Sequence, residues 1–81
     1  MALRFGEGEV HFDDHCVVED AMPLLAFLEA EADPQVRLAH CTGMHTALIQ
    51  VLAAIRPRIG SWPADPGLAR LLGGLMGMEP T

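Results

Sequence analysis

The segment over residues 36–52 changes its hydrophobic period once, and this change constrains the fold more than any other feature of the chain. Val36 and Leu38 alternate with other residues, which is typical of a strand that buries one face. From Thr46 the apolar residues recur at helical spacing, which predicts a helix. The Thr-Gly pair at 42–43 predicts a tight turn between the two elements. The segment is therefore a strand–turn–helix unit, a building block of α/β folds.

The remainder of the chain repeats this alternation of strands and helices. Alternating runs predict strands over residues 3–5, 9–12, 35–39 and 58–62, and helical spacing predicts helices over 20–32, 46–55 and 66–77. The resulting β-β-α-β-α-β-α order predicts a small mixed sheet of about four strands, with helices mainly on one face. A chain of 81 residues is long enough for one small domain, which we expect to span residues 1–81.

Several local predictions accompany this α/β interpretation. The polar run Asp13-Asp14-His15 is predicted to end the second strand, and Phe5 is predicted to point inward with Val10 and Phe12. Asp20 is predicted to cap the first helix, and Asp65, which is followed by Pro66, is predicted to cap the last. The last helix is predicted to bury one face, made of Leu68, Leu71, Leu72 and Leu75. Met76 and Met78 are assigned to a frayed tail, and Met44 to an adaptable contact surface.

Charge and composition exclude several classes of function. The formal net charge is −6, and the basic residues are scattered arginines at positions 4, 37, 56, 58 and 70. Nucleic-acid binding needs clustered basic side chains, so it is not expected. No apolar run approaches the length of a membrane span, and no signal peptide is visible at the start. We therefore expect a cytoplasmic protein, without membrane insertion, whose two cysteines are free thiols.

Histidine and cysteine residues follow two of the predicted strands. His15 and Cys16 come after the second strand, and His40, Cys41 and His45 come after the third. If these strands are parallel neighbours, their carboxyl ends share one edge of the sheet, where the five side chains could converge. Imidazole and thiolate together suit zinc, although no spacing matches a paired Cys-x-x-Cys signature. A metal-binding or thiol redox-sensing module is therefore the alternative hypothesis.

Thr46 stands at the start of the predicted helix and admits two roles. Threonine is a preferred N-cap residue, because its hydroxyl accepts a backbone N–H of the first turn. The same end of a helix favours negative charge, so a phosphate on the Thr46 hydroxyl would also be accommodated there. Both roles remain open at this point.

The arrangement resembles the STAS domain, the fold shared by anti-sigma-factor antagonists and the cytoplasmic tails of sulfate transporters. The resemblance runs from about Leu3 to Gly77. It is carried by Glu9-Val10-His11-Phe12, Val18-Glu19-Asp20-Ala21, Val36 to Thr42, Met44-His45-Thr46-Ala47-Leu48, and Leu68 to Leu75. Two positions depart from the family pattern: His45 stands where the family has Asp, and the Gly before Leu is absent.

The resemblance implies a bacterial signalling role without catalysis and without a cofactor. It assigns the role of phosphoacceptor to Thr46 and the role of partner contact to the surrounding turn and helix start. The partner-contact set is Thr42, Gly43, Met44, His45, Thr46, Ala47 and Ile49. The implied partner is a kinase-like anti-sigma factor, or another signalling or transport component. The oligomeric state, including a homodimer, is left open.

Overall fold

The computed structural model describes residues 2–77, and its elements follow the predicted order. The strands are β1 (Leu3–Phe5), β2 (Glu9–Cys16), β3 (Gln35–Met44) and β4 (Arg58–Ser61); the helices are η1 (Val18–Asp20), α1 (Ala21–Ala30), α2 (Thr46–Ile55) and α3 (Pro66–Met76). The predicted small α/β fold is confirmed. The short 3-10 turn η1 is the one addition to it.

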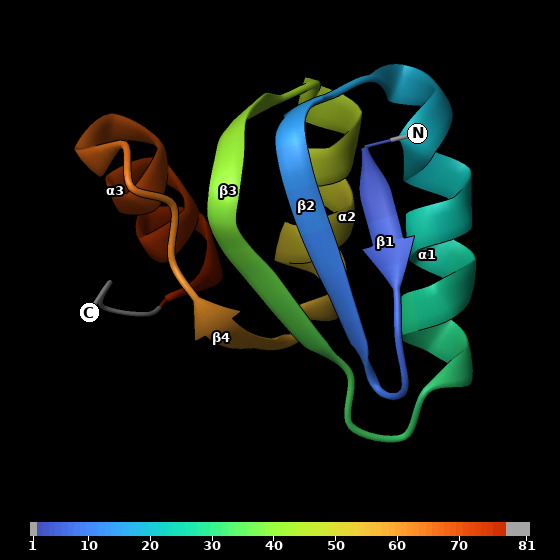
Figure 1. The fold of residues 1–81 in the computed structure, drawn as a ribbon. Coiled ribbons are helices and arrows are strands. Elements are labelled where there is room, and N and C mark those ends of the chain that lie inside the picture. The colour runs from blue at the N-terminus through green and yellow to red at the C-terminus, as the bar shows by residue number, and fades with distance from the viewer. Residues whose placement is uncertain (1, 78–81) are drawn as a thin grey trace.

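The four strands form one mixed sheet in the order β1-β2-β3-β4 (Figure 1). An antiparallel hairpin joins β1 to β2, and Gly8 occupies its turn with a φ of 70°, a conformation that glycine adopts without strain. β2 pairs with β3, and β3 with β4, in parallel. Since parallel strands need a crossover, α1 and α2 return the chain to the start of the next strand.

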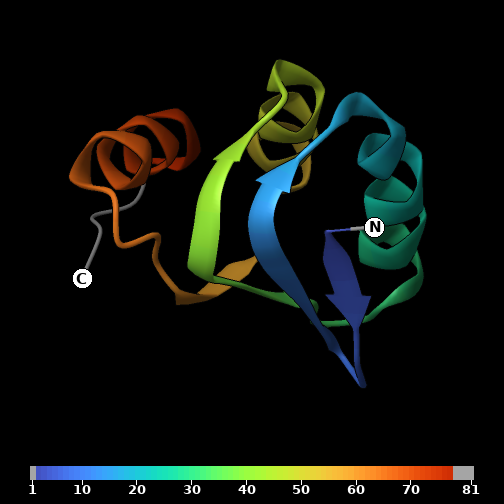
Figure 2. The same ribbon diagram turned by 45° about the horizontal axis from the view of Figure 1, so that its top comes forward.

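The helices leave one face of the sheet uncovered. Helices α1 and α2 lie side by side behind the sheet, and α3 lies beyond β3, on the side away from β1 (Figures 1 and 2). Within residues 2–77, no helix covers the face that looks toward the viewer in Figure 1. The sheet therefore has a helix-covered face and an open face.

The core is largely aliphatic and lies between the sheet and its helices. Each strand sends alternate side chains inward, so β2 contributes Val10 and Phe12 and β3 contributes Val36 and Leu38. The helices close this layer with buried leucines at 24, 28, 48, 52 and 72. These residues belong to one continuous cluster, so the sheet and all three α-helices share one core.

The prediction that Asp13-Asp14-His15 ends the second strand is wrong, because β2 continues through it to Cys16. Asp14 adopts the left-handed region with a φ of 53°, which Asp tolerates better than most residues. The register of β2 against β3 shifts between His11 and Asp13 and again between Asp14 and His15. A bulge thus absorbs the polar run, and the strand resumes with Cys16 buried.

The predicted Thr-Gly turn is also wrong, because β3 runs through Thr42 and Gly43 to Met44. The continued strand β2 supplies the partner, with His15 opposite Gly43 and Cys16 opposite Met44. Gly43 suits this position because a Cβ there would lie 2.8 Å from Nδ1 of His15. Pairing between the strands therefore overrides the local turn preference of Thr-Gly.

The remaining corrections concern which side chains are buried. In α3 the buried residues are Ala69, Leu72, Gly73 and Met76, whereas Leu71 and Leu75 are 48% and 44% exposed. Small residues at 69 and 73 let the helix backbone approach its neighbours, which turns the leucines at 71 and 75 outward. Met76 is core rather than tail, and Met78 lies outside the described residues. Phe5 is 43% exposed but packs against Phe27, with ring centroids 5.1 Å apart.

Element ends differ slightly from the predicted ones. Helix α1 ends at Ala30 rather than near Ala32, and β4 ends at Ser61 rather than Trp62. Asp65 caps α3 as predicted, since its carboxylate accepts the N–H of Leu68 at 2.8 Å. The side chain of Asp20 does not cap α1. Its carboxylate accepts the backbone N–H of Val17 at 3.0 Å, and this hydrogen bond stabilises η1.

The orientation of α3 predicts different costs for two adjacent leucines. Leu72→Ala removes a fully buried side chain and should lower the free energy of unfolding by about 2–5 kcal/mol. The matched control Leu71→Ala should change it by roughly 0.5 kcal/mol or less, because its side chain is half exposed. Urea denaturation followed by circular dichroism measures both; equal losses would contradict the placement of α3.

Candidate functional site

The carboxyl ends of β2 and β3 meet at one edge of the sheet, at the top of Figure 1. The backbone N–H of His45 donates a hydrogen bond to the carbonyl of Cys16, with 2.8 Å between the nitrogen and the oxygen. This bond joins the chain just after β3 to the last residue of β2. Helix α2 and the turn η1 therefore begin next to each other, and we call this region the β2–β3 edge.

His45, and not Thr46, caps helix α2. Its Nδ1 accepts the backbone N–H of Ala47 at 3.0 Å, and its carbonyl accepts the N–H of Leu48 at 3.0 Å. An imidazole nitrogen accepts a hydrogen bond only when it carries no proton, so His45 caps with Nδ1 unprotonated. The interpretation of Thr46 as the N-cap is thus wrong by one residue, because the extended backbone that a cap requires belongs to His45.

Thr46 is the first residue of α2, and its side chain is exposed. The hydroxyl therefore lies at the amino-terminal end of a ten-residue helix and is open to solvent. The interpretation as a phosphoacceptor stays a prediction, and the exposure that such a role needs is present.

The other predicted partner-contact residues differ in accessibility. Thr42 is exposed like His45, whereas Ala47 and Ile49 are half-buried. Gly43 is half-buried beneath His15. Met44 is only 8% exposed and belongs to the core, so its side chain does not form the adaptable surface expected from the sequence. The surface of the edge is thus formed mainly by the residues at 42, 45, 46 and 49.

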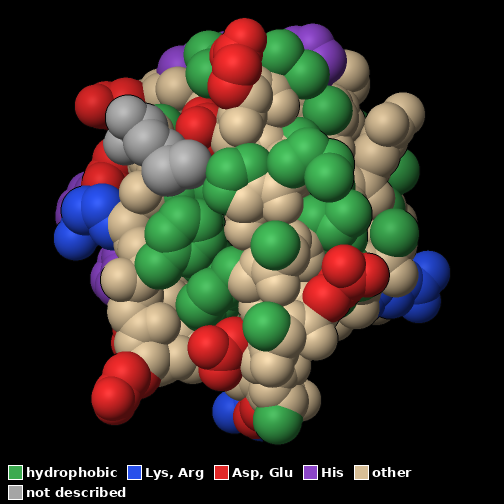
Figure 3. All heavy atoms as spheres, turned by 90° about the vertical axis from the view of Figure 1, so that its right-hand side faces the viewer, with side chains coloured by type: hydrophobic (Ala, Val, Ile, Leu, Met, Phe, Trp, Pro, Cys, Tyr) green, Lys and Arg blue, Asp and Glu red, His purple; other side chains and the backbone are tan. Residues whose placement is uncertain are grey.

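Exposed apolar side chains extend this surface on the side of η1. Val17 and Val18 are 46% and 47% exposed, and Met22 in the first turn of α1 is 72% exposed. Since Val17 follows Cys16, whose carbonyl binds the N–H of His45, these residues adjoin the start of α2. Figure 3 shows hydrophobic side chains gathered over the face that α1 presents. The hydrophobic patterns of the sequence did not predict this exposed apolar surface. The pair of adjacent valines at 17 and 18 was the sequence signal that could have indicated it.

The five residues of the alternative metal site do not converge. β2 and β3 are parallel neighbours as that hypothesis required, but a strand alternates its side chains between two faces. Cys16 and Cys41 point into the core, while His15 and His40 are exposed and His45 caps α2. Among residues 2–77, no three His, Cys, Asp or Glu side chains are arranged to hold a metal ion.

The two cysteines are free thiols buried in the core. A hydrogen bond shared with Cys41, together with burial, raises the pKa of Cys16 well above its usual range. The Cys41 thiol also donates to the carbonyl of Gly43, with 3.4 Å between sulfur and oxygen. The hydrogen bond with Cys16, together with the one to the carbonyl of Gly43, lowers the pKa of Cys41 to about 7. Both side chains are buried, so the folded protein shields the two thiols from reagents and they pack as core residues.

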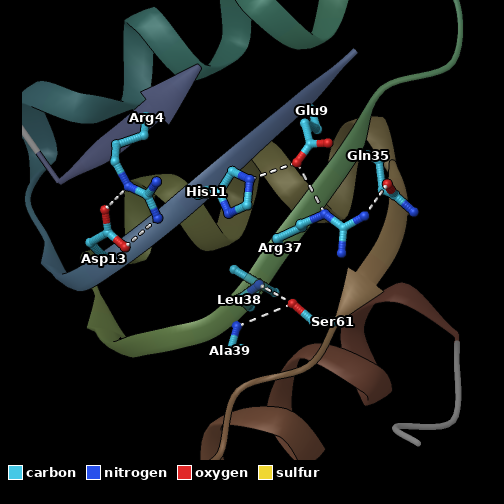
Figure 4. A network of polar contacts seen from close by, with 9 residues as sticks. All are labelled: Arg4, Glu9, His11, Asp13, Gln35, Arg37, Leu38, Ala39 and Ser61. Carbon is cyan, nitrogen blue, oxygen red and sulfur yellow. Dashed lines mark hydrogen bonds and ion pairs between the residues drawn. The ribbon is translucent and has the colours of Figure 1, made fainter. Parts of the chain in front are cut away.

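The open face of the sheet carries a polar network that the sequence patterns did not reveal (Figure 4). Arg4 of β1 donates two hydrogen bonds to the carboxylate of Asp13, which hold the pKa of Asp13 below its usual range. The carboxylate of Glu9 contacts two side chains, Nε2 of His11 at 2.6 Å and Nε of Arg37 at 3.1 Å. The only signal for this network is the alternation of these residues with buried ones along each strand.

Comparison with protein-family models, with curated proteins and with solved structures gives no match for this chain. In the part of the chain that the structure describes, no helix is both long and apolar enough to cross a bilayer.

Removal of the His45 imidazole tests its role as a helix cap. His45→Ala should lower the free energy of unfolding by about 1 kcal/mol, because the N–H of Ala47 loses its acceptor. His45→Asn should keep most of that stability, since an Asn side chain is also a good cap. Thermal unfolding at neutral pH provides the comparison; an Ala variant as stable as the Asn variant would refute the capping role.

Burial of the thiols predicts slow modification in the folded state. Both cysteines should react with a thiol-specific disulfide reagent at pH 8 only at the rate of protein opening, and rapidly in denaturant. The absorbance of the released chromophore follows the reaction. Fast modification of one thiol in folded protein would instead revive the redox-sensing hypothesis.

Proposed function

We propose that this chain is a protein-interaction domain of the STAS kind, without catalytic activity, that docks its partner through the β2–β3 edge. The observation that carries the proposal is the exposed hydroxyl of Thr46 at the first position of α2. The order of the elements and the parallel pairing of β2 with β3 are those that the resemblance implies, and this supports the proposal. The proposal therefore rests on both the fold and the position of one residue within it.

The exposed apolar side chains beside Thr46 support a docking role for this edge. Val17, Val18 and Met22 expose apolar surface next to a polar helix start. Protein interfaces combine an apolar centre with a polar rim, and valine and methionine side chains supply the apolar part here. Scattered apolar residues need no explanation, but these three lie in or beside the same short turn.

Phosphorylation of Thr46 would change this surface through charge. A phosphate adds about −1.5 to −2 charges at pH 7, and the amino-terminal end of a helix favours negative charge. The modified residue would thus be tolerated by α2 itself. A partner that packs against Val17 and Val18 would meet a strongly hydrated group at the centre of its contact, and its binding would weaken.

The departure at His45 does not remove the structural role of the residue before Thr46. An aspartate at a helix N-cap accepts a backbone N–H, and His45 accepts the N–H of Ala47 through Nδ1. The geometry of the helix start is thereby compatible with the STAS pattern. The negative charge that an aspartate would supply is missing, so we propose the docking role as primary and the phosphate switch as its regulation.

The partner of this proposal is a kinase-like anti-sigma factor or another signalling or transport component. A photo-crosslinking amino acid placed at Thr42 in cells of the source organism should trap it, while the same group at Gly67 should not. Both positions are exposed, but Gly67 lies at the start of α3, away from the β2–β3 edge. Mass spectrometry of the crosslinked product identifies the partner and the contact.

Calorimetry with the purified partner then separates docking from switching. Thr46→Glu should weaken binding by about tenfold, equivalent to about 1.4 kcal/mol, and Thr46→Ala by less than about threefold. Equal affinities for the wild type and both variants would refute the switch. Crosslinking at Gly67 rather than at Thr42 would refute the docking edge itself.

A further inference from the structure

The regular pairing of β3 with both neighbouring strands, β2 and β4, is interrupted around Leu38 and Ala39. Its register against β2 shifts between His11 and Asp13, and its register against β4 shifts after Val36. Strand β4 ends at Ser61, so no further backbone of β4 pairs with β3 beyond this point. The interruption with β2 and the interruption with β4 therefore fall on the same short stretch of β3.

Ser61 fills this interruption with its side chain. Its Oγ accepts the N–H of Leu38 at 3.1 Å and the N–H of Ala39 at 3.3 Å. Two successive backbone N–H groups that converge on one oxygen form the kind of concavity that binds anions in proteins. A hydroxyl oxygen has two lone pairs, and the two backbone N–H groups use both of them. The hydroxyl hydrogen of Ser61 can still donate a hydrogen bond to a ligand.

A pocket of about 240 Å³ opens beside Ser61. Its lining is His11, Phe12, Arg37, Ala39, His40 and Ser61. Figure 4 shows Arg37, His11 and Ser61 around the same stretch of β2 and β3. Four of the lining side chains can donate a hydrogen bond, and none of the six is a carboxylate. The lining thus suits a ligand that accepts hydrogen bonds.

The neighbouring carboxylates are already paired, Glu9 with two residues of the pocket lining and Asp13 with an arginine outside it. Glu9 contacts His11 and Arg37, and Arg4 pairs with Asp13. Arg37 uses Nε for Glu9 and Nη2 for Gln35, so among residues 2–77 its Nη1 makes no hydrogen bond. Glu9 and Gln35 therefore fix the direction of the guanidinium and leave it donors for a ligand.

We propose that this pocket binds a small oxyanion of the phosphate class. Arginine and imidazole donors beside a hydroxyl are the groups that recognise phosphate oxygens. The volume lies below the 300–1,000 Å³ typical of pockets for drug-sized ligands, which indicates inorganic phosphate or the phosphate group of a small ester. This site is on the open face and is independent of the docking edge proposed above.

Titration with inorganic phosphate tests the site directly. At constant ionic strength, phosphate should shift the ¹⁵N–¹H signals of Leu38, Ala39 and Ser61 saturably, with a dissociation constant of about 1 mM. Sodium chloride at the same ionic strength should not shift them. Non-saturating shifts, or equal shifts with chloride, would overturn the proposal.

Three variants tie the binding to the pocket. Arg37→Gln should weaken phosphate binding at least about fivefold, whereas Glu9→Gln should strengthen it by removing a nearby negative charge. Arg58→Gln is the matched control, because Arg58 is an exposed arginine that pairs with Asp33 and does not line the pocket. A loss of affinity in Arg58→Gln as large as that in Arg37→Gln would show that the ion binds by net charge alone and would refute the site.

Discussion

The parallel pairing of β2 with β3 is the interaction on which the other parts of the structure depend. It places Val10 beside Val36, and the inward residues of these two strands form the centre of the core. It also brings the ends of both strands to one edge, where the N–H of His45 meets the carbonyl of Cys16. The start of α2, with the exposed Thr46, is positioned by this pairing.

Irregularities within the same pairing create the features to which we assign function. The bulge at Asp14 lets β2 continue far enough to pair with the end of β3, which brings η1 beside α2. The register shift near Leu38 leaves two backbone N–H groups to Ser61 and opens the pocket beside it. The docking edge at the carboxyl ends of the strands and the proposed anion site on the open face thus belong to one strand pair and arise from separate departures from regular pairing.

The sequence predicted the order of elements because hydrophobic period is a local signal. The alternation of Val36 and Leu38, and the helical spacing after Thr46, each report burial within a few residues of chain. Asp65 with Pro66 marked the start of α3 for the same reason, since a helix cap acts within one turn. These local signals together determine the fold class, and strand directions followed from the crossover helices.

Features that depend on residues distant in the sequence were missed. The polar run at 13–15 and the Thr-Gly pair at 42–43 each look like a break until β2 and β3 are paired, with His15 opposite Gly43. Ser61 acts on amides at 38 and 39, and no pattern within either segment indicates that contact. The orientation of α3 depended on Ala69 and Gly73, whose burial reflects what the helix packs against rather than its own apolar spacing. The start of α2 at Thr46 was predicted from the sequence, whereas the role of His45 as its cap is a feature of the folded structure alone.

Hydrogen exchange at the amide of His45 tests the central claim most directly, because that N–H bridges β2 to the start of α2. If β2 continues past the bulge to Cys16, this amide should exchange as slowly as the paired amides in the middle of β3. Exchange at the rate of the unstructured chain, with the middle of β3 still protected, would mean that β2 ends before the edge. The docking surface would then not be formed as described.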